Sequence, residues 1–197
     1  MSDTTMTMFQ LTGRGYPPAD LSRASLVIID AQREYLKGPL ALSGIDDAVA
    51  NIARLLKAAR AAHRPIVHVR HLGTVGGLFD PQGDRGKFIP GLEPLGDETV
   101  IEKNMPNAFN NTPLHQTLQE KGPIDLIVCG FMTHSSISTT VRAAKDYGYR
   151  STLVEDACAT RDLPYKDGVV PAATVKQVGM ATMNDNFACV AQTADLV

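Results

Sequence analysis

Three side chains suited to hydrolysis stand far apart in this sequence: Asp30, Lys103 and Ser136. Asp30 follows the apolar run LVII, Lys103 follows TVIE, and Ser136 comes a few residues after LIVC. A carboxylate can take a proton from a hydroxyl nucleophile, and a nearby ammonium group stabilises the resulting anion. If the three groups meet, they predict hydrolysis at an acyl carbon.

Ser136 lies where a buried strand is expected to run into an amphipathic helix. The apolar run at 126–129 precedes it by a few residues, and after it Ile137, Val141 and Ala144 fall on one helical face. Backbone amides at a helix N-terminus stabilise negative charge, so an oxyanion beside Ser136 would find donors in place. The alternative is an ordinary N-cap, where serine is common in any protein.

The other two residues also have ordinary explanations. Asp30 could cap a helix or form a turn in DAQREY, although a charge directly after a fully apolar run needs a partner. Lys103, at the end of a short strand, could be a solvated surface group.

The elements that would bring these residues together form a regular alternation of strands and helices. Parallel strands joined by helices predict a three-layer α-β-α sandwich with a mostly parallel six-stranded sheet, Rossmann-like in architecture. The carboxyl ends of such strands share one edge, so the three side chains should converge there. We expect strands at 25–30, 66–70, 99–102, 126–129, 150–154 and 187–190, a loop at 155–160, and helices at 44–63, 112–121, from Ser136 to about Gly148, and 168–183.

Composition limits the classes of partner. The 197 residues include 19 basic and 21 acidic side chains without a basic cluster, which argues against nucleic acid or membrane binding and favours a small-molecule substrate. The three cysteines lie in or next to apolar runs, as reduced core thiols do, and no leader or membrane span is visible, so we expect a cytoplasmic protein. Residues 1–24 are expected to form an N-terminal arm before a single domain at 25–197.

The candidate substrate-binding residues lie near the strand ends and in a long loop at 72–95, rich in Gly and Pro, that we expect to cover the site. For the phenylalanines, packing in the core or in the loop is the alternative role. No phosphate-binding glycine motif, G-x-S-x-G or H-E-x-x-H is present, His68 is expected to be a core histidine, and we expect neither metal nor cofactor. The candidates are Tyr35, His71, Leu72, Phe79, Phe109 and His134.

Three segments together resemble the isochorismatase-like cysteine hydrolases, which include nicotinamidases, N-carbamoylsarcosine amidohydrolases and ureidoacrylate amidohydrolases. The segments are LVIIDAQREY, IEKNMPNAFNNTPLHQTL and IVCGFMTHSSISTTVRAAKDYGYRSTLVEDACAT, and the likeness spans about residues 25–193. The resemblance implies that Asp30 is the general base, Lys103 the second triad member and Ser136 the nucleophile position. It also implies a cis peptide at Phe131–Met132, amides of Met132 and Ser136 at the oxyanion, and a homo-oligomer.

Two departures from the family pattern leave alternatives open. Most members have cysteine where this chain has Ser136, and a hydroxyl needs more base assistance than a thiol. The chain is therefore a serine variant acting on an amide, ureide or related acyl substrate, an inactive natural or engineered member that retains only a binding or scaffold role, or an isochorismatase-type enzyme that hydrolyses a vinyl ether without a covalent intermediate. The loop RHLGTVGGLFDPQGDRGKF lacks the Asp-x-His of nicotinamidases, which argues against that activity.

Overall fold

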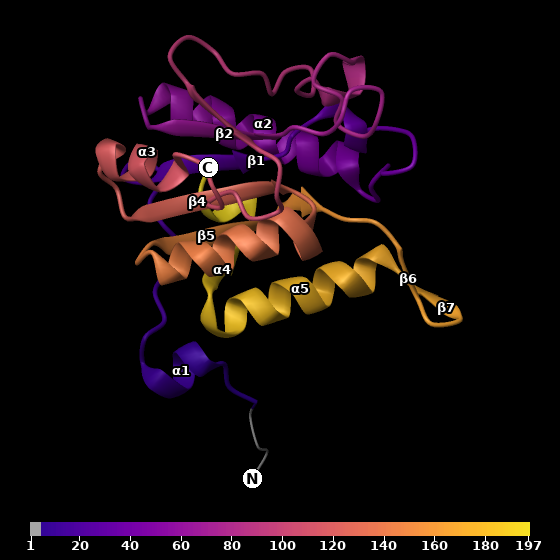
Figure 1. Ribbon diagram of the computed structural model, residues 1–197. Coiled ribbons are helices and arrows are strands. Elements are labelled where there is room, and N and C mark those ends of the chain that lie inside the picture. Colours follow the sequence, from indigo (N-terminus) through magenta and orange to yellow (C-terminus); the bar gives the residue numbers. More distant parts are fainter. Residues whose placement is uncertain (1–4) are drawn as a thin grey trace.

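The computed structural model describes residues 5–197 and contains the expected three-layer architecture (Figure 1). Six strands form one parallel sheet in the order β3-β2-β1-β4-β5-β8. β1 lies near the middle of this sheet, between β2 and β4, so its carboxyl end is flanked by those of its neighbours. The strands are β1 (Ser25–Ile29), β2 (Ile66–His71), β3 (Thr99–Lys103), β4 (Asp125–Phe131), β5 (Arg150–Ala159) and β8 (Ala188–Ala191).

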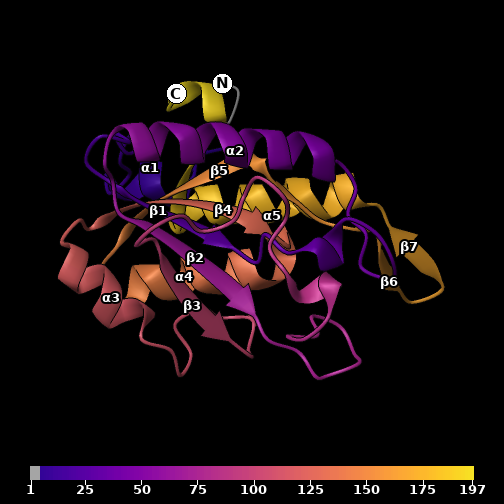
Figure 2. The ribbon, with the colours of Figure 1, turned by 90° about the horizontal axis from the view of Figure 1, so that it is seen from above.

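Helices cover both faces of the sheet, which explains why β1 is apolar at nearly every position (Figure 2). Leu26 and Ile28 belong to the core on the side of α2 (Ile45–Ala61). Val27 and Ile29 point the other way, into the core under α3 (Leu114–Lys121), α4 (Ser138–Asp146) and α5 (Ala172–Asn186). Because β1 is buried on both faces, Leu26 to Ile29 are all apolar. The polar side chain that this part of the chain brings to the site is therefore Asp30, directly after the strand.

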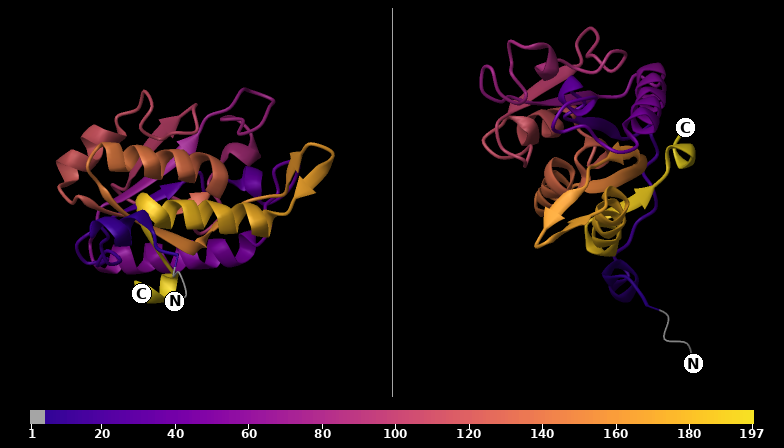
Figure 3. Two further views of the ribbon diagram at one scale, coloured as in Figure 1. Left: turned by 90° about the horizontal axis from the view of Figure 1, so that it is seen from below. Right: turned by 90° about the vertical axis from the view of Figure 1, so that its right-hand side faces the viewer.

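The segment before the sheet carries one short helix, α1 (Met8–Thr12), which lies outside the three layers (Figures 1 and 3). The backbone N–H of Met8 donates to Asp185 of α5 over 2.8 Å. Residues 1–4 of the expected arm lie outside the described residues, and the boundary at residue 24 stays a prediction.

Two predictions for the C-terminal third were wrong. Residues 155–159, expected in a loop, continue β5, because pairing with β4 resumes after a register shift and joins Gly130 to Cys158. Residues 168–170, expected in a helix, form a two-stranded antiparallel hairpin of β6 (Leu163–Tyr165) and β7 (Gly168–Val170). Pro171 then precedes α5, where its fixed φ suits a helix start.

The long loop at 72–95 is held down by the segment that follows β1. Backbone bonds link Arg33 to Lys87 and Ile89 to Ala31, and the loop contains one 3-10 turn, η2 (Asp84–Gly86). A second 3-10 turn, η1 (Arg33–Tyr35), buries Glu34, whose carboxylate accepts the N–H of Phe79. The segment directly after Asp30 therefore also holds the loop at 72–95 in place. Within residues 5–197, no helix combines the length and apolar character needed to cross a bilayer.

Candidate active site

Asp30 leaves β1 in an unusual backbone conformation. Its φ is 53°, in the left-handed region that aspartate tolerates better than most residues. Beside it, Gly130 of β4 has a φ of 119°, and a Cβ there would lie 2.0 Å from the carbonyl oxygen of Ile29. Only glycine allows β1 and β4 to approach so closely, and this approach brings the Asp30 turn next to the segment that leads to Ser136.

Ser136 lies in a π-helical turn, Thr133–Ile137, that precedes α4. The carbonyl of Met132 accepts N–H groups from both Ser135, over 3.1 Å, and Ile137, over 3.3 Å. The helical path therefore begins three residues before Ser136, so the prediction that Ser136 itself opens the helix was wrong. The peptide bond between Phe131 and Met132 is cis, as the resemblance implied.

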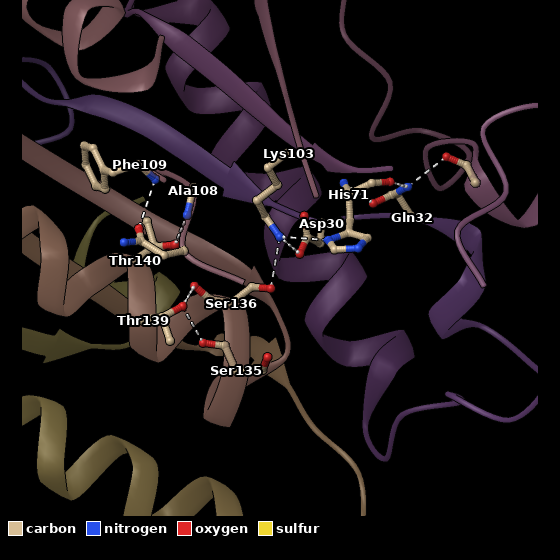
Figure 4. A network of polar contacts seen from close by, with 12 residues as sticks. Asp30, Gln32, His71, Lys103, Ala108, Phe109, Ser135, Ser136, Thr139 and Thr140 are labelled. Carbon is tan, nitrogen blue, oxygen red and sulfur yellow. Dashed lines mark hydrogen bonds and ion pairs between the residues drawn. The ribbon is translucent and has the colours of Figure 1, made fainter. Parts of the chain in front are cut away.

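Lys103 joins the two other groups (Figure 4). Its Nζ lies 2.7 Å from Asp30 Oδ2 and 3.1 Å from Ser136 Oγ. All three residues are buried, with exposed fractions of 1% for Asp30, 3% for Lys103 and 5% for Ser136. The expected convergence at the carboxyl edge is present, and Lys103 is not the solvated surface group that was its alternative explanation.

The Asp30 carboxylate has few donors for a fully buried charge. Oδ2 accepts from Lys103, whereas Oδ1 has no hydrogen-bond partner among residues 5–197. Burial raises the pKa of Asp30 above its ordinary value, and the charge and hydrogen bond of Lys103 and the Ser136 hydroxyl only partly oppose this effect. A carboxylate in this state is a stronger proton acceptor than one in water.

His71 is the candidate substrate-binding residue that lies closest to the three. Its Nδ1 is 3.4 Å from Lys103 Nζ, and its ring lies against Phe79 with the ring centroids 4.9 Å apart. Burial and the neighbouring Lys103 charge lower the pKa of His71 to about 4. The imidazole is therefore neutral at physiological pH.

Gln32, which the sequence did not single out, holds His71 in place. Its side-chain Oε1 accepts the backbone N–H of His71 over 2.8 Å, and its Nε2 donates to the His71 carbonyl over 2.9 Å. Nε2 also donates to the carbonyl of Gly86 over 2.9 Å. The signal available in the sequence was only a polar residue two positions after Asp30, because glutamine is ordinarily a surface residue.

Three more of the candidate substrate-binding residues, Leu72, Phe79 and Tyr35, lie near the site. Leu72 continues the pairing beyond β2, with its N–H donating to the Lys103 carbonyl over 2.8 Å. Phe79 touches His71 and also Tyr35, which is buried between Phe79 and Phe131. Tyr35 thus lies beneath the site wall, in the core.

Among residues 5–197, no hydrogen bond joins the side chain of Phe109 or His134 to the triad. The Phe109 ring stacks on Tyr147 and Tyr149, in the core under α3 and α4, away from Asp30 (Figure 4). That packing is the alternative role anticipated for a phenylalanine. His134 precedes Ser136 in the π-turn and pairs with Thr160 over 2.7 Å. A role for either in substrate binding stays a prediction.

Potential metal ligands are dispersed. Across the part of the chain that the structure describes, no three histidine, cysteine, aspartate or glutamate side chains gather in a group that could hold a metal ion. Cys129 and Cys158 are buried free thiols, and burial raises the pKa of both. The expectation of metal-independent chemistry stays a prediction.

Comparisons with known proteins bear on the family and the fold of this chain. The family model "Isochorismatase domain" matches residues 24–195. An uncharacterized isochorismatase family protein of Bacillus subtilis is 41% identical over 172 residues, covering 86% of this chain and 96% of the relative. A streptothricin hydrolase of Streptomyces noursei is 30% identical over 86% of this chain and 69% of its own. The crystal structure of an isochorismatase from Pseudomonas putida has a TM-score of 0.97 and 74% identity, covering 98% of this chain and 100% of that one.

Proposed function

This chain belongs to the isochorismatase family and is a hydrolase, and we propose that it cleaves a small amide, ureide or related acyl substrate through Asp30, Lys103 and Ser136 without a metal ion. The observation that carries the proposal is the buried hydrogen-bonded chain from Asp30 through Lys103 to Ser136. The three groups come from separate strand ends and are nearly inaccessible to water.

The proton of the Ser136 hydroxyl goes to Asp30 in this proposal. Ser136 Oγ already accepts a hydrogen bond from Lys103, so its own hydrogen is directed to a different acceptor. Asp30 Oδ1 has no other partner within residues 5–197, and the raised pKa of Asp30 favours its accepting a proton. As the proton leaves, Oγ bonds to the acyl carbon and the carbonyl electrons move onto oxygen. When the oxyanion collapses, the C–N bond breaks and the protonated Asp30 gives its proton to the leaving nitrogen. Water, losing a proton to Asp30, then attacks the acyl group on Ser136. The acid is released, and Asp30 returns that proton to Ser136 Oγ.

Lys103 supplies charge in this step. An ammonium that donates to Asp30, Ser136 and His71 has each of its three hydrogens engaged and no lone pair to offer as a base. Its positive charge stabilises both the Asp30 carboxylate and the developing Ser136 alkoxide. In a buried site such an interaction is screened far less than in water.

We assign the oxyanion position to the backbone N–H groups of Met132, which directly precedes the π-helical turn, and of Ser136, which lies within it. This assignment follows the family resemblance and the positive end of the helix that the turn opens. Leu72, His71 and Phe79 form the proposed substrate wall nearest the triad, with Tyr35 packed behind it.

The substrate class rests on the relatives. Besides the streptothricin hydrolase, a nicotinamidase of Arabidopsis thaliana is 40% identical over 151 residues and a ureidoacrylate amidohydrolase of Variovorax paradoxus 25% identical over 172 residues. The last two names denote cleavage of an amide bond, and the first denotes a hydrolase. We therefore propose amide-type substrates here, with a nicotinamide substrate disfavoured by the loop after β2.

A second candidate is isochorismatase-type hydrolysis of a vinyl ether without a covalent intermediate. The observation in its favour is again Asp30, since a buried carboxyl with a raised pKa can also hold a proton and donate it to carbon. Water would then add to the oxocarbenium ion, and Ser136 would only orient it. The two candidates differ in whether Ser136 is ever acylated.

Intact-protein mass spectrometry separates the two candidates. The protein is incubated with p-nitrophenyl acetate, streptothricin, ureidoacrylate and isochorismate, and quenched in acid at short times. The proposal expects an acyl adduct on Ser136 that is absent in Ser136→Ala. Isochorismate turnover without any adduct supports the second candidate. An unmodified protein that also turns over none of the four contradicts the proposed function.

The substrate is the only partner that the proposed chemistry requires. Assembly into a homo-oligomer, a cytoplasmic location and the absence of nucleic-acid or membrane partners stay predictions. Light scattering of the purified protein tests the first of these directly.

A further inference from the structure

We propose that His71 contacts the substrate as a neutral hydrogen-bond donor, presenting the hydrogen on Nε2 to a polar group of the substrate other than the carbonyl that Ser136 attacks. The inference rests on the proposed function and adds the tautomer, the donor atom and the group that positions it.

The contact with Lys103 sets the tautomer. An ammonium has hydrogens to donate and no acceptor, so His71 Nδ1, 3.4 Å from Lys103 Nζ, faces it with a lone pair. A neutral imidazole that accepts at Nδ1 carries its hydrogen at Nε2. A doubly protonated ring would place two cations side by side. The low pKa of His71 agrees with this electrostatic argument.

The Nε2 atom is available to a substrate. It has no hydrogen-bond partner among residues 5–197, and it is not among the fully enclosed polar atoms that lack one. The side chain as a whole is half-buried, whereas Lys103 and Asp30 beneath it are buried. A donor that is committed on one side and open on the other points its free hydrogen outward from the triad.

Gln32 and Phe79 hold the ring in this orientation. Gln32 is completely buried and pairs with both backbone polar groups of His71, in the way that a neighbouring strand would. This extends the pairing of β1 with β2 beyond the last backbone pair, Ile29 with Val69. Phe79 packs against the ring from the loop. Figure 4 shows Gln32 on the side of His71 away from Ser136. We therefore assign Gln32 as a positioning residue.

Two isosteric variants separate this role from a purely structural one. His71→Gln places an amide N–H₂ near the position of Nε2 and gives up the contact at Nδ1. His71→Asn places an amide near Nδ1, where it can still face Lys103, and removes the outer donor. If His71 only supported Lys103, asparagine would preserve activity and glutamine would not.

The kinetic test uses the full-length protein with whichever of streptothricin and ureidoacrylate it turns over, because both carry polar groups besides the bond that is cleaved. We expect His71→Asn to lose about 10- to 100-fold in kcat/KM, as the loss of a hydrogen bond to a desolvated acceptor does, and His71→Gln to remain within about fivefold of wild type. Thermal midpoints of both variants serve to detect a folding defect. Equal activity of His71→Asn and wild type, or a larger loss in His71→Gln than in His71→Asn, overturns the proposal.

A second measurement needs no substrate. In ¹⁵N-labelled protein, the ring nitrogens of His71 should report the Nε2–H tautomer and stay unchanged from pH 5.5 to 8, an interval above the pKa of about 4. Titration near the ordinary histidine value, or a hydrogen on Nδ1, overturns the proposal. Absence of any acyl adduct on Ser136, with the expected tautomer present, would instead locate the failure in the proposed function.

Discussion

Two carboxylates in this protein, the buried Asp30 and the partly buried Glu98, show how the same chemical group serves structure in one place and reaction in another. Glu98 accepts four hydrogen bonds, from Arg60 Nε and Nη2, from His68 Nε2 and from the backbone N–H of Leu95. Asp30 accepts one strong bond from Lys103 and leaves Oδ1 without a partner in the described chain.

The difference in donors reverses the direction of the two pKa shifts. Burial raises the pKa of both groups, but at Glu98 the bonds from Arg60, Leu95 and His68 prevail and hold it at about 2. At Asp30 burial prevails over Lys103. A carboxylate surrounded by donors is held in its charged form and does not take up protons at working pH. One that is under-supplied with donors is poised to accept a proton, which is the property that a general base needs.

Neutralising each carboxylate in turn tests whether only Asp30 takes part in the reaction. Asp30→Asn should lower kcat by about 10³- to 10⁴-fold, because no acceptor remains for the Ser136 proton. Glu98→Gln should leave kcat within a few-fold of wild type. Steady-state rates with p-nitrophenyl acetate, with circular dichroism of both variants to verify folding, test this pair. A comparable loss of activity in both would show that the site does not depend on Asp30 in particular.

The pH dependence of activity should carry the signature of Asp30. Because the reaction needs the ionised carboxylate and burial raises its pKa, kcat/KM should rise with pH, with a midpoint above that of an ordinary aspartate. His71, neutral above about pH 4, should add no limb near its usual value of 6.5. A pH–rate profile from 4 to 9 measures this. A midpoint at or below the ordinary aspartate value would contradict the assignment of the base.

Glu98 should matter for stability rather than for the reaction. Glu98→Gln leaves the completely buried His68 without its anionic partner, and we expect a loss of about 1–3 kcal/mol in the free energy of unfolding. For a chain of this size that corresponds to about 2–10 °C in thermal midpoint.

This stability loss should itself depend on pH. The folded pKa of Glu98 is depressed, so its contribution is present above about 4.5, the value in the unfolded chain, and disappears as pH falls toward 2. The gap in thermal midpoint between wild type and Glu98→Gln should therefore narrow below pH 4.5. The raised pKa of Asp30 has the opposite effect on stability. Protonation removes the cost of burying its negative charge, so the contribution of Asp30 to folding improves as the pH falls. A gap that widens in acid would refute the role given to Glu98.

A third carboxylate, the exposed Asp84, should have the smallest effect on the free energy of unfolding. Asp84 pairs with Arg33 over 2.7 Å, but 61% of its side chain is exposed. Water and salt screen such a pair, so Asp84→Asn should change the unfolding free energy by less than about 0.5 kcal/mol. Denaturant titration provides the value, and a larger loss would mean that the η2 turn depends on this ion pair.

Much of the fold was predictable because burial leaves its pattern in local sequence. The six parallel strands appear as apolar runs, and α2 and α4 appear as apolar residues at helical spacing. The β6–β7 hairpin was missed because an exposed two-stranded hairpin has no buried face and therefore no apolar pattern. The extension of β5 was missed because its later residues pair only after a register shift relative to β4.

By itself, the sequence determined the alternation of strands and helices, the identity of Asp30, Lys103 and Ser136 as candidates, and their common edge of the sheet, because crossover connections leave few other arrangements. Tertiary structure alone decided which oxygen of Asp30 remains free, which nitrogen of His71 faces Lys103, and that Gln32 is buried against His71. Those features depend on contacts between residues up to 73 positions apart, as between Asp30 and Lys103. Hydrogen bonds and burial at such separations have no periodicity in the sequence, and it is they that determine the charge state on which the proposed chemistry depends.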